Sequence, residues 1–489
     1  MTRGVIATPH RLASEAGAQI LRDGGNAIDA AIAADAVLCV VYPQMTSVGG
    51  DLMAIVWPAG AASPVGLIGA GRSGELASID AVRERGHGVM PERGALTITV
   101  PGTVEAWGRL IERFGTLGLA VVTAAAESLA QDGFVITPNL SESLKQAAGM
   151  LGHEPAAYAL YPPMDGGMLL RNPDLASVLH DIGRNGINGF YRGEIGAAIA
   201  AAIAKRDGFV RARDLATPSV QWVDPVTLGY RDVTVYELPP PTHGLIALEL
   251  LRQLAPRTQA ALQPGTGFVK TFRDARDASY RLRDLITDPD FVAFPGTADA
   301  HVPDGGDTVY LGAADEHGNL VSLIQSVAYD FGSGIVAEGT GILLQNRGCY
   351  FSLDPAHANR IEPKKRTRHT LIPAMATREG RPWAVFGSMG GDGQPQLQTQ
   401  VLINLVDHRL EPQEAVARPR FRIRPDGNSM CIEATYPGAP ELARKDRTVE
   451  LLPPGRNTFG HAHAILIDGP QAWRAGFDPR SDGSVEQVG

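Results

Sequence analysis

The chain has 489 residues, a formal net charge of −9 and 44% hydrophobic residues, a composition typical of a globular protein with an extensive buried core. The negative charge disfavours a nucleic-acid-binding protein, because such proteins need clustered basic residues to neutralise phosphates. The one short basic group, at residues 364–368, is expected to be a solvated loop.

The cysteines and the N-terminus bear on the compartment. Cys39, Cys349 and Cys431 include no CxxC pair, so they indicate neither a zinc ribbon nor a disulfide framework and are expected to be buried thiols in a reducing environment. The N-terminal segment becomes polar too early for a secretory signal, and the apolar stretch 30–41 is too short to span a bilayer. We therefore expect a cytoplasmic protein with no membrane segment.

The first fifty residues predict two helices and a turn. Residues 14–21 are amphipathic and end at a Gly-Gly pair, which can adopt the left-handed conformation that stops a helix. Asn26 is suited to cap a second helix that runs to Val41. This helix is small and apolar on nearly all faces, which is typical of a helix buried between layers. A strand is predicted over residues 52–57.

Two motifs suggest ligands that we do not expect. Gly69, Gly71 and Gly74 follow a strand-like run in the GxGxxG pattern, but a dinucleotide site also needs a second strand that ends in an acidic residue, and the next segment resembles a loop. His461 and His463 lie on one side of a strand-like segment without an evident third ligand, so we expect no metal site. No cofactor is predicted.

The sequence pattern changes near residue 300, from mostly helical before it to mostly strand-like after it. The Pro-rich turn 239–244 is expected to be structural, and residues 301–307 are expected to form an exposed linker. Two β-rich runs then surround the turn 316–319, which predicts a hairpin, and a strand over 383–387 leads into Gly390-Gly391. Helices from the first two thirds and strands from the last third together predict an α/β layered sandwich. The main helices predicted after residue 100 cover residues 104–112, 124–131, 194–204 and 269–283.

Thr308, which begins the first run of the hairpin, is a candidate nucleophile. A threonine at a free N-terminus carries its own base, because its α-amine can take the hydroxyl proton. The oxyanion formed by its attack needs N–H donors, which the Gly390-Gly391 turn could present. Ser326, on the second run of the hairpin, could orient the threonine oxygen.

Nine landmarks occur in one order from about residue 4 to residue 466, and together they resemble the gamma-glutamyltransferase superfamily of N-terminal-nucleophile (Ntn) hydrolases. They are LASEAG at 12–17, GGNAIDAA at 24–31, SVGG at 47–50, VPGTV at 100–104, the run 308–315 with its following Gly-Asn, FGSG at 331–334, GILLQN at 341–346, the Gly390-Gly391 pair and PRF at 419–421.

The resemblance implies a four-layer αββα sandwich and a precursor that cuts itself between Asp307 and Thr308. The Thr308 hydroxyl would attack the Asp307 carbonyl, and hydrolysis of the resulting ester would free the threonine amine. A large part, 1–307, and a small part, 308–489, would stay associated as one shared sandwich, and a homodimer of such pairs is one option.

The pocket expected from the resemblance is altered. At the positions where gamma-glutamyltransferases hold the amino and carboxylate groups of glutamate with Asn, Gln and Asp, this chain has Ala328, Arg347 and Tyr350. Loss of the Asp removes the charge that would bind an ammonium group, whereas the Arg347 fork suits a carboxylate.

Three further residues complete the predicted substrate site. Arg72 lies in the segment where the family carries its carboxylate-binding arginine, although a surface arginine is the alternative. His369 and Thr370 replace a serine pair; Thr370 keeps a hydroxyl, and His369 could donate to the substrate or tune the site. The short connection 354–366 leaves no lid loop. The run Asn-Arg-Gly at 346–348, followed by an aromatic residue, and the run MGGDGQP at 389–395 resemble a side branch that includes cephalosporin acylases and oxamate amidohydrolases.

We therefore predict an enzyme: a self-processing amidohydrolase that cleaves a small-molecule amide with a carboxylate-bearing acyl group through a Thr308 acyl-enzyme. Two alternatives stay open. One is a glutathione hydrolase or gamma-glutamyl transferase proper. The other is an unprocessed, non-catalytic binding protein of the same fold, because the Asp307 charge lies beside the carbonyl that must be attacked.

Overall fold

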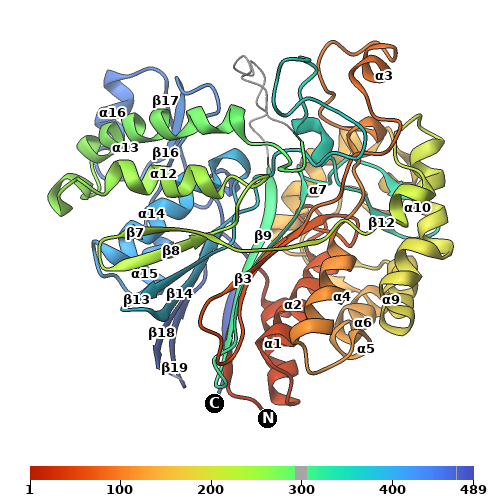
Figure 1. The fold of residues 1–489 in the computed structure, drawn as a ribbon, viewed down its shortest axis with the longest axis horizontal. Helices are drawn as coiled ribbons and strands as arrows, with labels where there is room; N and C mark the ends of the chain where they lie inside the picture. The colour runs from red at the N-terminus through yellow and green to blue at the C-terminus, as the bar shows by residue number, and fades with distance from the viewer. Residues whose placement is uncertain (292–305, 470) are drawn as a thin grey trace.

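The computed structural model describes residues 1–291, 306–469 and 471–489 of the chain, so most of the predicted linker 301–307 lies outside the described residues. Two β-sheets stack face to face at the centre of the molecule, and helices cover the outer face of each sheet (Figure 1). This arrangement is the αββα sandwich that the order of motifs predicted.

The first sheet contains the predicted hairpin at its centre. Its strands β9 and β10 pair antiparallel around the turn 316–319, which confirms the hairpin. The sheet order is β20 (Ser484–Val488), β1 (Gly4–Thr8), β9 (Asp307–Asp315), β10 (Leu320–Ala328), β2 (Asp51–Trp57), β3 (Val65–Gly69) and β6 (Gln221–Val223).

The second sheet packs on the first through a continuous apolar layer that includes Val5, Met53, Ile324, Val385 and Ile465. Both sheets draw strands from before and after residue 308, so neither part of the chain could bury this layer alone. The order of the second sheet is β19 (Ala472–Gly476), β18 (Ala462–Gly469), β14 (Arg381–Ser388), β13 (Ala374–Arg378), β8 (Val233–Glu237) and β7 (Val226–Tyr230).

Helix α2 (Ala27–Val41) lies against the first sheet and is buried along its whole length. The Asn26 side chain accepts from the N–H groups of Ile28 and Asp29, and the Asp29 carboxylate accepts from the Asn26 N–H, so the predicted cap is confirmed as a capping box. The same layer contains α1 (Arg11–Arg22), α4 (Thr103–Phe114), α6 (Ala124–Asp132), α9 (Pro173–Arg192) and α10 (Glu194–Ala204).

The second helical layer contains two helices that the sequence did not predict, α12 (Gly244–Leu254) and α14 (Gln394–Val406). Helix α14 is buried on all faces, so it lacks the apolar period of a surface helix. Two of its glutamines donate to backbone carbonyls: Gln396 to Ile423 and Gln400 to Phe421. Helices α13 (Thr266–Ser279) and α15 (Pro412–Ala417) complete the layer.

The remaining elements are short, apart from α7, and lie around the two layers. None of the described helices is long and apolar enough to cross a membrane. The remaining helices and strands are α3 (Ile79–Arg83), α5 (Leu119–Val122), α7 (Pro138–Leu151), α8 (Pro155–Leu160), α11 (Ala212–Leu215), α16 (Ala439–Lys445), β4 (Phe134–Val135), β5 (Leu169–Leu170), β11 (Val336–Ala337), β12 (Ile342–Leu343), β15 (Phe421–Ile423), β16 (Met430–Glu433) and β17 (Val449–Leu452).

The structure describes two loops that the sequence singled out: the glycines at 69–74 and the basic group at 364–368. No helix follows the glycines after β3 until α3, and a Cβ added at Gly71 would lie 1.6 Å from the Val100 carbonyl oxygen, so this glycine serves close packing. The prediction of a solvated loop at residues 364–368 holds for Lys364, which is exposed, and is wrong for the other basic residues. Lys365, Arg366 and Arg368 are buried, because carboxylates of the segment before residue 291 and backbone carbonyls surround them.

Candidate functional site

Thr308 is the second residue of β9 and is almost fully buried. The Ser326 hydroxyl on the neighbouring strand β10 donates to the carbonyl oxygen of Asp307 at 2.5 Å. It accepts in turn from the Ala328 N–H at 2.7 Å. Ser326 therefore contacts the carbonyl of the Asp307–Thr308 bond, which is the predicted cleavage site.

A β-bulge accounts for this contact. The register of β9 and β10 shifts between Gln325 and Ala328, and Ala328 has a positive φ of 79°. An extra residue in one strand re-aims the side chains beside it, and here the bulge turns Ser326 towards the neighbouring backbone. The Asn346 N–H binds the carbonyl of Val327 within the bulge at 3.1 Å. The segment that carries Arg347 is thus fastened next to Ser326.

The Gly390-Gly391 turn reaches the same place from the second sheet. Gly390 and Gly391 have φ values of 141° and 53°, which only glycine adopts without strain. A Cβ added at Gly306 would lie 2.4 Å from the Gly391 Cα, so the turn touches the backbone two residues before Thr308. The structure therefore brings Thr308, Ser326 and the glycine turn together.

Arg347 lies in a second group of predicted residues beside the first. The residue is 2% exposed, and its guanidinium donates to the Thr370 hydroxyl at 3.1 Å and lies over the Tyr350 ring with 5.1 Å between Cζ and the ring centroid. Among the described residues, its Nε and Nη2 have no hydrogen-bond partner. A buried cation with unused donors requires an anion, because its desolvation is otherwise uncompensated.

His369 uses its ring nitrogens within the protein. Its Nδ1 accepts from the Leu371 N–H at 3.3 Å, and its Nε2 lies 3.2 Å from the Asp51 carboxylate. Burial, with Arg347 and His243 nearby, lowers the pKa of His369 well below its usual value, so the ring is neutral and Nε2–H donates to Asp51. His369 is therefore a partner of Asp51 in this structure.

Asp51 is the residue of this site that sequence reasoning missed. It starts β2 directly opposite Ser326, and its other carboxylate oxygen accepts from the Gly71 N–H at 3.3 Å. Burial raises the pKa of Asp51 to about 7, although Arg347 and backbone N–H groups oppose the shift. Its position directly after the SVGG landmark was the available signal, but the pairing with His369, 318 residues away, is visible only in three dimensions.

Arg72 pairs with carboxylates outside the group formed by Arg347, His369 and Asp51. Its guanidinium binds the carboxylates of Asp288 and Asp290 at 2.9 and 2.6 Å, and it also donates to the Lys364 carbonyl at 2.9 Å. Asp288 is fully buried and accepts in addition from the Arg366 N–H at 2.9 Å. The structure thus places Arg72 in an ion cluster with carboxylates of its own chain.

Asp307 is half-buried and lies beside the predicted cleavage site. Burial and the neighbouring Asp330 carboxylate raise its pKa to about 7, while Arg93 opposes the shift. A carboxyl group with this pKa is neutral in a large share of molecules near neutral pH. The charge beside the carbonyl is therefore a smaller obstacle to attack than the sequence suggested.

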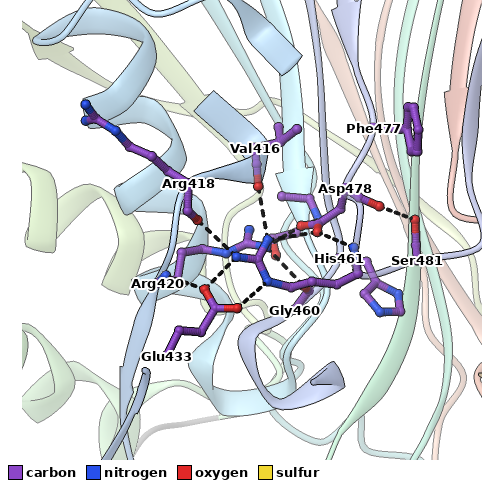
Figure 2. A network of polar contacts seen from close by, with 12 residues as sticks. Val416, Arg418, Arg420, Glu433, Gly460, His461, Phe477, Asp478 and Ser481 are labelled. Carbon is purple, nitrogen blue, oxygen red and sulfur yellow. Dashed lines mark hydrogen bonds and ion pairs between the residues drawn. The ribbon is translucent and has the colours of Figure 1, made fainter. Parts of the chain in front are cut away.

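A buried ion network surrounds residues 460–462 (Figure 2), and the His461 carbonyl binds the N–H of Met389, the residue before the glycine turn. Arg420 pairs with Asp478, and Arg480 donates from Nη1 to Asp478 at 2.9 Å and from Nη2 to Glu433 at 2.6 Å. The Glu433 carboxylate also accepts from the Arg420 N–H at 2.8 Å. Two cations and two anions thus compensate one another inside the protein.

This network makes acid stability a testable property. Burial alone would raise the pKa of Asp478, but Arg420 and Arg480 outweigh it and lower the pKa to about 2 from 3.8. A depressed carboxylate pKa stabilises the fold above the unfolded-state pKa, and this stabilisation is lost as pH falls through the folded-state pKa. We expect about 2 kcal/mol of unfolding free energy to be lost between pH 5 and pH 2 through this group.

The measurement is urea unfolding of the full chain at both pH values, compared with Asp478→Asn. The stability difference between the two proteins should shrink by about 2 kcal/mol on acidification, since Asn cannot titrate. A difference that stays constant with pH would contradict the expectation.

Comparison with known proteins places the chain in a family. A family model for gamma-glutamyltranspeptidase matches residues 13–302 and 295–488. The glutathione hydrolase-like YwrD proenzyme of Bacillus subtilis is 33% identical, and the match covers 99% of this chain and 98% of that protein. The oxamate amidohydrolase proenzyme of Klebsiella pneumoniae is 34% identical, with coverage of 99% and 98%.

The solved structures agree. The crystal structure of cephalosporin acylase from Bacillus halodurans has a TM-score of 0.90 and 33% identity, and the match covers 99% of this chain and 96% of that chain. The Helicobacter pylori gamma-glutamyltranspeptidase structure has a TM-score of 0.55 and 29% identity over 58% of this chain and 85% of that chain. The relatives are hydrolases made as proenzymes, and the chain is an enzyme that belongs to the gamma-glutamyltranspeptidase family, with its Ntn-hydrolase fold.

Proposed function

We propose that this protein is a self-processing amidohydrolase that uses Thr308 to hydrolyse small amides whose acyl group bears a carboxylate but no α-amine. The buried Arg347 guanidinium, with two donor nitrogens unused among the described residues, carries this proposal. The backbone that carries it is fastened next to Ser326 by the bond from the Asn346 N–H to the Val327 carbonyl, and in this proposal the guanidinium binds the carboxylate of the acyl group.

The first step is the cut itself. The Thr308 hydroxyl adds to the Asp307 carbonyl carbon, and the Ser326 hydroxyl stabilises the oxygen that becomes negative. The C–N bond then breaks as the threonine nitrogen takes a proton, which leaves an ester between Asp307 and the Thr308 side chain. The threonine amine is free from this point, and water then hydrolyses the ester to give the main-chain carboxylate of Asp307 and the Thr308 hydroxyl.

The second step repeats this chemistry on the substrate. The free α-amine of Thr308 takes the hydroxyl proton as the oxygen attacks the amide carbonyl, and it returns a proton to the departing amine. N–H groups of the Gly390-Gly391 turn stabilise the oxyanion. Water then resolves the acyl-enzyme to a free acid, so no cofactor is required.

The carboxylate is assigned to Arg347 rather than to Arg72. A substrate could take Arg72 only by displacing Asp288 and Asp290, and Asp288 would then be buried without that cation. Uncompensated burial of a charge is costly. By the resemblance, Tyr350 takes the position where the family holds the substrate ammonium group, and a tyrosine offers no charge for an α-amine.

The substrate comparison tests the proposal directly. Purified, cut protein is incubated separately with oxamate and with glutathione, and the released ammonia or glutamate is measured. We expect kcat/KM for oxamate to exceed that for glutathione. The reverse order would favour the alternative, a glutathione hydrolase. The relatives include both a glutathione hydrolase-like proenzyme and an oxamate amidohydrolase proenzyme.

Replacing Ser326 by alanine should slow the cut. Loss of one oxyanion donor typically costs a hundred- to a thousand-fold in rate, roughly, and Ser326 is the side chain that contacts the Asp307 carbonyl. The measurement is the half-time of conversion from one band to two on denaturing gels. Ser326→Thr keeps the hydroxyl and should cut faster than the alanine variant; equal rates in all three proteins would exclude the role.

A further inference from the structure

The glycine turn is held from behind by a backbone contact. The Met389 N–H donates to the His461 carbonyl at 3.0 Å. A Cβ added at Gly460 would lie 2.4 Å from the Met389 carbonyl oxygen, so the two backbones are in direct contact. The position of the turn therefore depends on the position of residues 460–462.

One ion pair fixes both ends of that segment (Figure 2). Arg420 Nη2 donates to the Gly460 carbonyl at 3.1 Å, and the Asp478 carboxylate accepts from the Ala462 N–H at 2.8 Å. Arg420 and Asp478 are themselves paired. The pair thus clamps three consecutive residues, and the middle one, His461, supplies the carbonyl that holds Met389.

Asp392, which follows the glycine turn, is bound by two residues that precede the predicted cut. The Tyr280 hydroxyl donates to the Asp392 carbonyl at 2.6 Å, and Arg283 pairs with the Asp392 carboxylate at 3.2 Å. With the clamp behind and these contacts in front, residues 389–392 have little freedom to move. Gly391 in turn touches the backbone two residues before Thr308.

Stability alone does not explain the network. Burying four charged groups is expensive, and well-packed apolar residues are often as stable as a buried ion pair or more stable. Directional hydrogen bonds, in contrast, fix a backbone segment in one register. Oxyanion donors need such fixing, because they act only when aimed at the developing charge.

We propose that Arg420 and Asp478 are positioning residues for the oxyanion turn, acting through Gly460 and His461. The inference rests on the proposed function, since it assumes that the Gly390-Gly391 turn binds the oxyanion. It assigns a role in the chemical step to a pair that touches neither substrate nor nucleophile.

The chain offers a matched control for the test. Asp407 is also a buried aspartate, paired with Arg231 at 2.8 Å and with the Tyr230 hydroxyl at 2.7 Å. It follows the last residue of α14, whereas the glycine turn precedes the first. These two ends lie about 20 Å apart at 1.5 Å per residue. Asp407→Asn therefore removes a comparable buried charge far from the turn.

Asp478→Asn and Asp407→Asn are compared with the parent protein, with oxamate turnover expressed per cut chain. We expect Asp478→Asn to lower kcat roughly a hundred-fold while KM changes less than about two-fold, as for loss of an oxyanion donor. Both variants should lower the unfolding temperature by similar amounts, but Asp407→Asn should keep the kcat of the parent protein. Equal effects of both variants on kcat, or an unchanged kcat in Asp478→Asn, would overturn the inference.

Two additions keep the test decisive. Arg420→Lys retains the charge but loses the planar fork, so it should lower kcat even if Asp478→Asn fails to fold. Hydrogen exchange at the Met389 amide reports the clamp without any turnover: it should accelerate at least ten-fold in Arg420→Lys and stay constant in Asp407→Asn. A parent protein that is uncut or inert defeats the proposed function, whereas unchanged exchange at Met389 defeats the positioning role.

Discussion

Replacing Thr308 by alanine is expected to leave one uncut chain of 51.8 kDa with no amidase activity, whereas the parent protein should run as two bands whose masses sum to that value. The reason is that one hydroxyl serves both reactions: it attacks the Asp307 carbonyl in the precursor and the substrate carbonyl in the cut enzyme. Alanine has no atom that can form either ester. Denaturing electrophoresis and ammonia release measure the two losses.

The matched control is Thr308→Ser, which keeps a hydroxyl and should still be cut. Both variants should remain folded, because Thr308 is buried but each change removes few atoms. A cut Thr308→Ala chain would assign the nucleophile to another residue. An uncut parent protein would instead favour the non-catalytic binding protein.

Local patterns predicted the parts of the fold that depend on neighbours in sequence. The Asn26 cap, helix α2 and the β9–β10 hairpin follow from residue types within a few positions of one another, and all three are present. Helix α14 was missed because its burial on every face removes the period that sequence reasoning uses. The start of α12 was hidden by the Pro-rich turn before it.

In the site, too, local motifs predicted some residues, whereas the contacts between distant residues were not predictable. Thr308, Ser326 and the glycine turn could be named from the order of motifs, but the β-bulge that brings Ser326 to the Asp307 carbonyl has no sequence signature. The partners of charged residues were not predictable. Arg366 looked like part of a solvated group and is buried, and Arg72 faces two aspartates more than 200 residues away. Such pairings depend on long-range topology, which one sequence does not encode locally.

The same side-chain contacts would hold the site in the precursor and in the cut enzyme. Ser326 and Asp51 face each other across β10 and β2, Asp51 binds His369, and Arg347 binds Thr370 next in sequence. This chain of contacts links the bond to be cut with the cation proposed for the substrate. A geometry that supports attack on Asp307 therefore also fixes where a substrate carboxylate lies relative to Thr308.

Replacing Arg347 by glutamine is expected to lower kcat/KM for oxamate by roughly 30- to 150-fold, which corresponds to the loss of about 2–3 kcal/mol for a charge-assisted hydrogen bond. The neutral analogue oxamide, which has the same reacting amide but no carboxylate, should be affected far less. Arg347→Lys keeps the charge without the fork and should fall between the parent and Arg347→Gln. Steady-state kinetics on the two substrates with the three proteins measures these effects.

The stability of the same variants separates a substrate-binding cation from a structural one. Without substrate, the Arg347 guanidinium is buried and only partly satisfied by the described residues, so its removal should leave the unfolding temperature unchanged or raise it. A structural arginine would do the opposite: Arg347→Gln would unfold at lower temperature and would lose activity on oxamate and oxamide alike. Selective loss of oxamate turnover in a protein that is no less stable would assign the carboxylate to Arg347, because no other change in the variant distinguishes the two substrates.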